Sequence, residues 1–142
     1  MQAIYALADT PRGPFIDTKP QRVAGEHQPG DNAMKSLTHK SCTYKIWMAG
    51  DVTLAKTIVR KYCDKIGDCY AVTTVDYIYT GGDAAGFCVS RIQYPRFPIS
   101  EAEIRERTNE LAKLLCEGLC QKSYTVEGPS NTVWFSGDDD EH

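Results

Sequence analysis

The sequence predicts an α+β fold, a two-layer sandwich in which a mainly antiparallel sheet carries two helices on one face. Its 142 residues suffice for one ordinary domain, with 42% hydrophobic and 25% charged residues. Two stretches have apolar residues at three- and four-residue spacing, and short β-branched or aromatic runs flank them in the order β-α-β-β-α-β-β. Each amphipathic helix needs one apolar cover, which an antiparallel sheet can provide.

Three segments are expected along the chain. Residues 1–43 are rich in proline and glycine, so they are predicted to form a disordered N-terminal arm or one that wraps a partner subunit. Residues 44–137 are predicted to form a ligand-binding α+β domain, and residues 138–142 a solvated acidic tail. Without a long apolar run or a secretory signal, a cytoplasmic protein with free cysteines is expected.

The first strand and helix are predicted at the start of the domain. The run 44–49 is short, apolar and aromatic, which is typical of a strand. Asp51 can cap the helix that follows, in which apolar side chains form one stripe. Gly67 supplies a left-handed stop for this helix.

A hairpin is predicted next. β-branched and aromatic residues dominate 69–80, which indicates a long strand, and a second strand is expected over 87–94. Residues 81–86 include three glycines and are predicted to join the strands as a longer hairpin loop. Pro95 and Pro98 end the second strand because neither can donate a ladder hydrogen bond.

The second helix and two short strands complete the domain. Ser100 and Glu103 are predicted to form a capping box, in which Glu103 reaches back to the helix start, and the helix should end near Gln121. Short strands are predicted over 124–127 and 132–136. Aromatic residues alternate onto the sheet face that the helices leave open, and this face is expected to pack on another subunit.

The composition of the domain argues against catalysis. Residues 44–137 contain no histidine, which removes the commonest general base and metal ligand. Asp64 and Asp68 are predicted on a solvated helix face, and Cys116 and Cys120 in the core. The chain is therefore predicted not to be an enzyme, with no catalytic residue, cofactor or metal. Eleven basic and eleven acidic residues favour a small charged ligand over a nucleic-acid polymer.

Two segments have the chemistry to bind a small anion. Backbone N–H groups of the loop 80–86 can converge on an anion, although a plain hairpin loop explains the glycines equally. In the segment 94–98, two prolines display Arg96 for a phosphate and Phe97 for a base, unless Phe97 fills the core of a rigid crossover. A further anion site, or an ordinary solvated face, is the basic side of the first helix: Lys56, Arg60 and Lys61.

Several segments resemble a phage protein family. They are residues 45–51, 60–63, 77–82, 92–98 and 132–134, and the most specific are YIYTGG and YPRFP. The family is the first of the Thoeris anti-defence proteins of bacteriophages, and the resemblance covers residues 44–136.

This resemblance implies a sponge that sequesters a signal. Such proteins bind glycocyclic ADP-ribose from bacterial TIR-domain enzymes without cleaving it, and some also bind cyclic di- or trinucleotides. The resemblance also implies dimers that assemble to hexamers, and action in the cytoplasm of the infected bacterial host. The alternatives are a hydrolase that destroys the nucleotide signal and an interaction module that blocks a host defence protein.

Eight residues are expected to bind the ligand. They are Thr80, Gly81, Gly82, Tyr94, Arg96, Phe97, Asn109 and Trp134. Arg96 is expected to pair with the phosphates and Phe97 to stack on the base. The remaining residues are expected to supply polar contacts to the phosphates, ribose and adenine, and one wall of the pocket.

Overall fold

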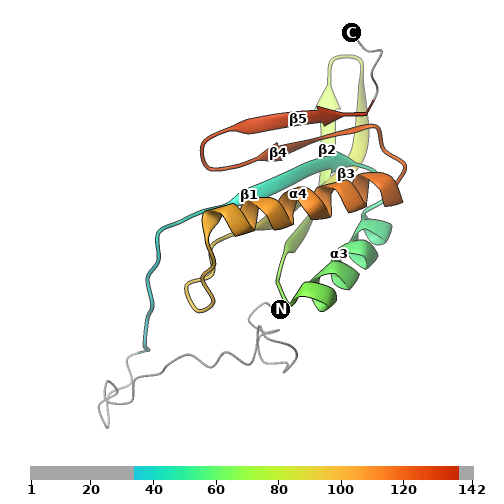
Figure 1. The fold of residues 1–142 in the computed structure, drawn as a ribbon. Helices are drawn as coiled ribbons and strands as arrows, with labels where there is room; N and C mark the ends of the chain where they lie inside the picture. The colour runs from blue at the N-terminus through green and yellow to red at the C-terminus, as the bar shows by residue number, and fades with distance from the viewer. Residues whose placement is uncertain (1–33, 138–142) are drawn as a thin grey trace.

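The computed structural model describes residues 34–137 and confirms the predicted α+β fold (Figure 1). The predicted acidic tail and most of the predicted arm lie outside the described residues. The elements follow one another as β1 (Tyr44–Ala49), α3 (Val52–Ile66), β2 (Ala71–Tyr79), β3 (Gly82–Arg91), α4 (Glu101–Gly118), β4 (Ser123–Glu127) and β5 (Thr132–Ser136). Neither of the described helices is long and apolar enough to cross a membrane.

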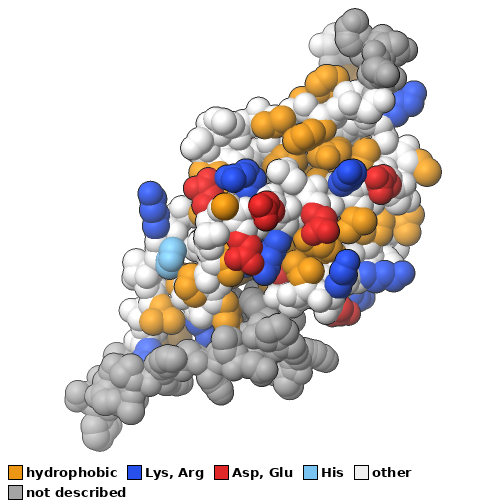
Figure 2. Space-filling model, in the orientation of Figure 1, with side chains coloured by type: hydrophobic (Ala, Val, Ile, Leu, Met, Phe, Trp, Pro, Cys, Tyr) orange, Lys and Arg blue, Asp and Glu red, His pale blue; other side chains and the backbone are white. Residues whose placement is uncertain are grey.

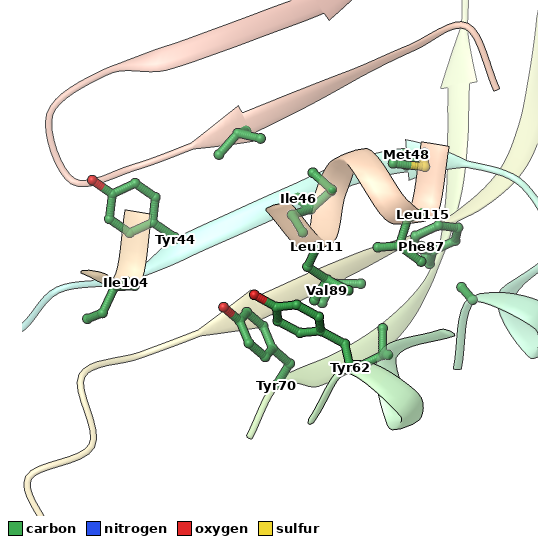
Figure 3. Packing of buried hydrophobic residues seen from close by; sticks show 14 of the residues in the cluster. Tyr44, Ile46, Met48, Tyr62, Tyr70, Phe87, Val89, Ile104, Leu111 and Leu115 are labelled. Carbon is green, nitrogen blue, oxygen red and sulfur yellow. The ribbon is translucent and has the colours of Figure 1, made fainter. Parts of the chain in front are cut away.

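The described strands form one antiparallel sheet in the order β2-β3-β1-β4-β5. The helices α3 and α4 lie on one face of this sheet (Figure 1), and no element of residues 34–137 covers the other face. The core lies between the helices and the sheet (Figure 3). Its largest apolar side chains come from β1, β3 and α4, and they include Ile46, Phe87, Ile104, Leu111 and Leu115. Each such side chain stabilises the fold by about 1.5–3 kcal/mol.

The helix caps follow the sequence prediction except at one carboxylate. Asp51 accepts a hydrogen bond from the Thr53 backbone N–H at 2.9 Å, and Gly67 ends α3 in the left-handed conformation. The Ser100 hydroxyl accepts from the Glu103 backbone N–H at 3.1 Å. The Glu103 carboxylate, predicted to reach back to the helix start, instead accepts a hydrogen bond from Arg107 at 2.8 Å. A charged partner one turn along the helix is a stronger donor than the backbone.

The predicted long hairpin loop is wrong. Tyr79 pairs with Gly82, so the turn consists only of Thr80 and Gly81, and β3 already includes the rest of the predicted loop. Small residues are needed there because the Tyr77 ring crosses the strand. A Cβ on Gly86 would come within 2.5 Å of the Tyr77 ring. The glycine therefore marks a close approach within a strand rather than a turn.

Asp68 is also not solvated, in contrast to its predicted place on a helix face. Its carboxylate pairs with Arg91 at 2.9 Å and with Arg107 at 2.9 Å, and the side chains of Asp68 and Arg91 are each 1% exposed. This buried network joins the end of α3 to β3 and α4. Two arginines satisfy the one carboxylate, so the network has a structural explanation.

Candidate functional site

The predicted ligand-binding residues lie at opposite ends of the β2–β3 hairpin. Thr80, Gly81 and Gly82 are at its turn, whereas Arg96 and Phe97 follow the far end of β3. The ten residues of β3 separate the two groups by about 30 Å. A single chain therefore does not bring them to one small ligand, and their role in binding stays a prediction.

The other predicted residues are also separated. Tyr94 is buried, and its hydroxyl donates to the Cys69 carbonyl oxygen at 3.3 Å. Asn109 is half-buried on α4, in the helical layer, whereas Trp134 is 61% exposed on β5. Only Arg96 and Phe97 remain adjacent, with the guanidinium carbon 5.1 Å from the ring centre.

The face of the molecule that carries the helices does not present charge of a single sign. Acidic and basic side chains are interspersed over it (Figure 2). Among residues 34–137, no group of three His, Cys, Asp or Glu side chains could hold a metal ion. The candidate site lies on the sheet face that the helices leave open.

Strand register gathers charged and aromatic side chains on this open face. Trp134 pairs with Thr125, Thr125 with Trp47, and Trp47 with Cys88, so these four residues form a row across the sheet. One step along the strands, Lys45 of β1 lies opposite Glu127 of β4. We define the open-face cluster as Lys45, Trp47, Cys88, Glu127 and Trp134.

Side-chain contacts connect three members of this cluster, Lys45, Trp47 and Glu127. The Trp47 indole N–H donates to Glu127 Oε1 at 2.8 Å, and Lys45 Nζ is 5.9 Å from the centre of the Trp47 ring. Burial raises the pKa of the Cys88 thiol, the Lys45 charge lowers it and the Glu127 charge raises it. The Lys45 ammonium group and the Glu127 carboxylate therefore both lie near Cys88 and Trp47. This part of the sheet offers a ligand a cation, an anion and an aromatic face.

A groove extends this cluster beyond the end of β1. It has a volume of about 360 Å³, and its lining includes Lys45, Glu127, Thr43 and Pro129. This volume is at the lower end of the range for small-molecule sites, about 300–1,000 Å³. A ligand that carries both a positive and a negative group fits the two charges at the rim of the groove.

Sequence reasoning missed most of this cluster. Trp134 was a candidate, but Lys45, Trp47 and Glu127 were not singled out as ligand-binding residues. The alternation of residues along the strand could have placed Lys45 and Trp47 on the open face, because they alternate with buried residues of β1. The pairing of Lys45 with Glu127 depends on the register between β1 and β4, which alternation alone does not specify.

Comparison with known proteins finds a shared fold. No family model and no curated protein matches the chain. A phage S-adenosylmethionine lyase in its apo state has 16% sequence identity and a TM-score of 0.58, over 75% of this chain and 98% of that chain. The structure of a phage S-adenosylmethionine lyase with S-methyl-5′-thioadenosine has 15% identity and a TM-score of 0.51, over 75% and 97%.

These similarities overturn the prediction that the chain is not an enzyme. The solved proteins that share its fold are named as enzymes. The prediction rested on the absence of histidine from residues 44–137, and this absence excludes only chemistry that needs histidine. The neighbours come from a phage, as the resemblance implied, but they are lyases rather than Thoeris anti-defence proteins.

Proposed function

We propose that this chain is a phage enzyme that cleaves S-adenosylmethionine, with the open-face cluster as its substrate site. The observation that carries the proposal is the fold shared with the phage lyase over nearly the whole length of that chain. A second support is the cluster itself, which combines a carboxylate, an ammonium group and two indoles. The infected host cytoplasm is where a phage enzyme would meet this substrate.

The charges of the substrate match those of the cluster. S-adenosylmethionine carries an α-carboxylate, an α-ammonium group, a sulfonium cation and an adenine ring. Lys45 binds the carboxylate and Glu127 the ammonium group, each through a charge-assisted hydrogen bond. The exposed ring of Trp134 stacks on adenine, and the Trp47 ring faces the sulfonium, with a cation–π attraction of about 0.5–2 kcal/mol.

The chemistry requires no histidine. The Cγ–S bond breaks and its electron pair stays on sulfur, so the sulfonium becomes the neutral thioether of S-methyl-5′-thioadenosine. An oxygen of the substrate carboxylate forms the new bond to Cγ and closes a five-membered lactone. No proton is transferred, and opposite charges are neutralised as the reaction proceeds. The protein therefore has to fold the substrate into a reactive conformation and exclude water, which is catalysis by positioning.

The test is to incubate the purified full chain with S-adenosylmethionine and separate the products by liquid chromatography with mass spectrometry. S-methyl-5′-thioadenosine and the lactone are expected in equal amounts. Glu127→Gln should lower kcat/KM about 10- to 100-fold, because one charge-assisted bond of about 1.5–3 kcal/mol is lost. The matched control Lys113→Gln, at an exposed position of α4, should not change it.

Two results would contradict the proposal. One is intact S-adenosylmethionine after incubation with a folded chain. The other is recovery of an unbroken cyclic ADP-ribose isomer from the heat-denatured protein after expression beside a TIR enzyme. S-adenosylhomocysteine serves as the substrate control, because it lacks the sulfonium charge and should remain uncleaved. The implied homo-oligomer stays a prediction, which light scattering of the purified chain can check.

A further inference from the structure

A second groove, of about 710 Å³, lies beside the substrate groove. Its walls are the segment 39–42 before β1, the segment 98–101 at the start of α4, and the turn between β4 and β5. The two grooves share Ser41, Cys42 and Pro129 as lining residues, but the larger groove has neither Lys45 nor Glu127 in its lining. The larger groove therefore adjoins the smaller one but is lined by different charged side chains.

The charged side chains that line this larger groove are one cation, Lys40, and one carboxylate, Glu101. Lys40 forms no ion pair with the acidic residues of the described chain, so its ammonium charge is not neutralised locally. The one carboxylate in the lining, Glu101, already accepts a hydrogen bond from the Tyr44 hydroxyl at 3.1 Å. His39 Nδ1 is 3.1 Å from the Lys40 carbonyl oxygen, which accepts a hydrogen bond when Nδ1 carries the proton.

Hydroxyl groups and apolar walls complete the groove. Ser100 uses a lone pair to cap α4, so its O–H hydrogen is still available to an acceptor. Ser41 and Ser130 add two further hydroxyls, and Pro98 and Ile99 form an apolar wall. Hydroxyl and ammonium donors beside an apolar wall suit a molecule with one anionic group and one flat apolar part.

We propose that the larger groove binds a small phosphate-bearing molecule, with the phosphate at Lys40 and the serine hydroxyls. Arg96 is exposed and lies two residues before Pro98, which lines the groove; in the proposed site it is the second cation for the phosphate. The segment that displays Arg96 and Phe97 thereby acquires an anion-binding role that the substrate site does not use. This inference does not depend on cleavage of S-adenosylmethionine.

The experiment titrates the isotopically labelled full chain with adenosine 5′-monophosphate, adenosine and inorganic phosphate, followed by amide chemical shifts. Adenosine 5′-monophosphate should shift the signals of His39, Ser41 and Ser130, whereas adenosine should shift them at least tenfold more weakly. Lys40→Gln and Arg96→Gln should each raise the dissociation constant about tenfold, which corresponds to about 1.4 kcal/mol.

The matched control is Lys113→Gln, at an exposed position of α4, which should leave the dissociation constant unchanged. Equal binding of adenosine and its monophosphate would overturn the inference, as would unchanged affinity in Lys40→Gln. Shifts confined to the Trp47 indole would also overturn it, because the phosphate would then be in the substrate site. Failure of the cleavage assay leaves these titration results unaffected, so the two proposals fail separately.

Discussion

Two glycines of the β2–β3 hairpin, Gly86 and Gly81, disfavour an added side chain for different reasons. At Gly86, an added Cβ would lie 2.3 Å from the Met48 carbonyl oxygen and 2.5 Å from the Tyr77 ring. The Tyr77 hydroxyl also donates to the Phe87 carbonyl oxygen at 3.0 Å, which holds the ring over the strand. At Gly81, the space around a Cβ is open, but its φ of +88° disfavours any L side chain.

We expect Gly86→Ala to lower the free energy of unfolding by about 3 kcal/mol, because backbone atoms cannot move away from the new methyl group. Gly81→Ala should cost only about 1 kcal/mol of backbone strain. Urea denaturation followed by tryptophan fluorescence measures both. Equal losses in the two variants would show that the close approach at Gly86 does not limit stability.

The buried carboxylate of Asp68 leads to a second prediction. Asp68→Ala leaves Arg91 buried without its partner, and we expect a loss of about 3–5 kcal/mol in the free energy of unfolding. Glu103→Ala removes only the more exposed pair with Arg107 and should cost less than about 0.5 kcal/mol. Calorimetric melting of both variants tests this order, and a larger loss in Glu103→Ala would contradict it.

These residues mark a limit of sequence reasoning. Asp68 follows the end of α3 at helical spacing from Asp64, so periodicity placed it in solvent. Its partners Arg91 and Arg107 come from β3 and α4, and only the tertiary fold brings the three charges together. Tyr94 is a similar case, because an aromatic side chain between Gln93 and Pro95 does not reveal that its hydroxyl bonds to a backbone carbonyl inside the protein.

At the scale of elements, helix and strand boundaries were easier to predict than these tertiary contacts, because they depend on nearby residues. Helix boundaries were predictable because caps act through one or two nearby residues, as at Asp51 and Gly67. Strand boundaries were predictable where β-branched and aromatic residues dominate, as in β2. The sequence prediction started β3 too late because Ala84, Ala85 and Gly86 have low strand preference. In the structure, pairing with β2 and the cross-strand contact of Tyr77 outweigh that low preference.

The cap of α4 gives a prediction at this scale. Ser100→Ala removes the acceptor for the Glu103 backbone N–H, so the free energy of unfolding should fall by about 1 kcal/mol. Ser100→Asp keeps an acceptor at the same place and should retain most of the stability. Urea denaturation midpoints measure the difference, and identical midpoints for the alanine variant and the unmodified chain would contradict the capping role.

For the molecule as a whole, the open-face cluster depends on how strands are ordered. β1 lies between β3 and β4, so side chains from the first and the last third of the domain become neighbours. The sequence predicted an open sheet face with aromatic residues, but it could not predict which charges meet there. Register and strand order follow from the whole packing arrangement, and they place Lys45 opposite Glu127.

Buried ionisable groups in α3 and in the connection to β2 predict how the stability of the whole fold responds to alkali. Burial and, to a smaller extent, the charge of Asp68 together raise the pKa of the Cys63 thiol from 9.0 to about 12. Burial also raises the pKa values of Cys69 and Tyr70. Above pH 9 the unfolded chain loses thiol protons that the folded chain retains. Stability is therefore complete below about pH 9 and falls as the pH rises toward 12.

We expect the free energy of unfolding to fall by roughly 2 kcal/mol between pH 7.5 and 10.5 from Cys63 alone, with further loss from the other buried groups. Urea denaturation at pH 7.5, 9.0 and 10.5 under reducing conditions measures this fall. Cys63→Ala cannot ionise at this position, so its stability should fall by about 2 kcal/mol less over the same range. If Cys63→Ala and the unmodified chain lose equal stability over this pH range, folding does not raise the pKa of the Cys63 thiol.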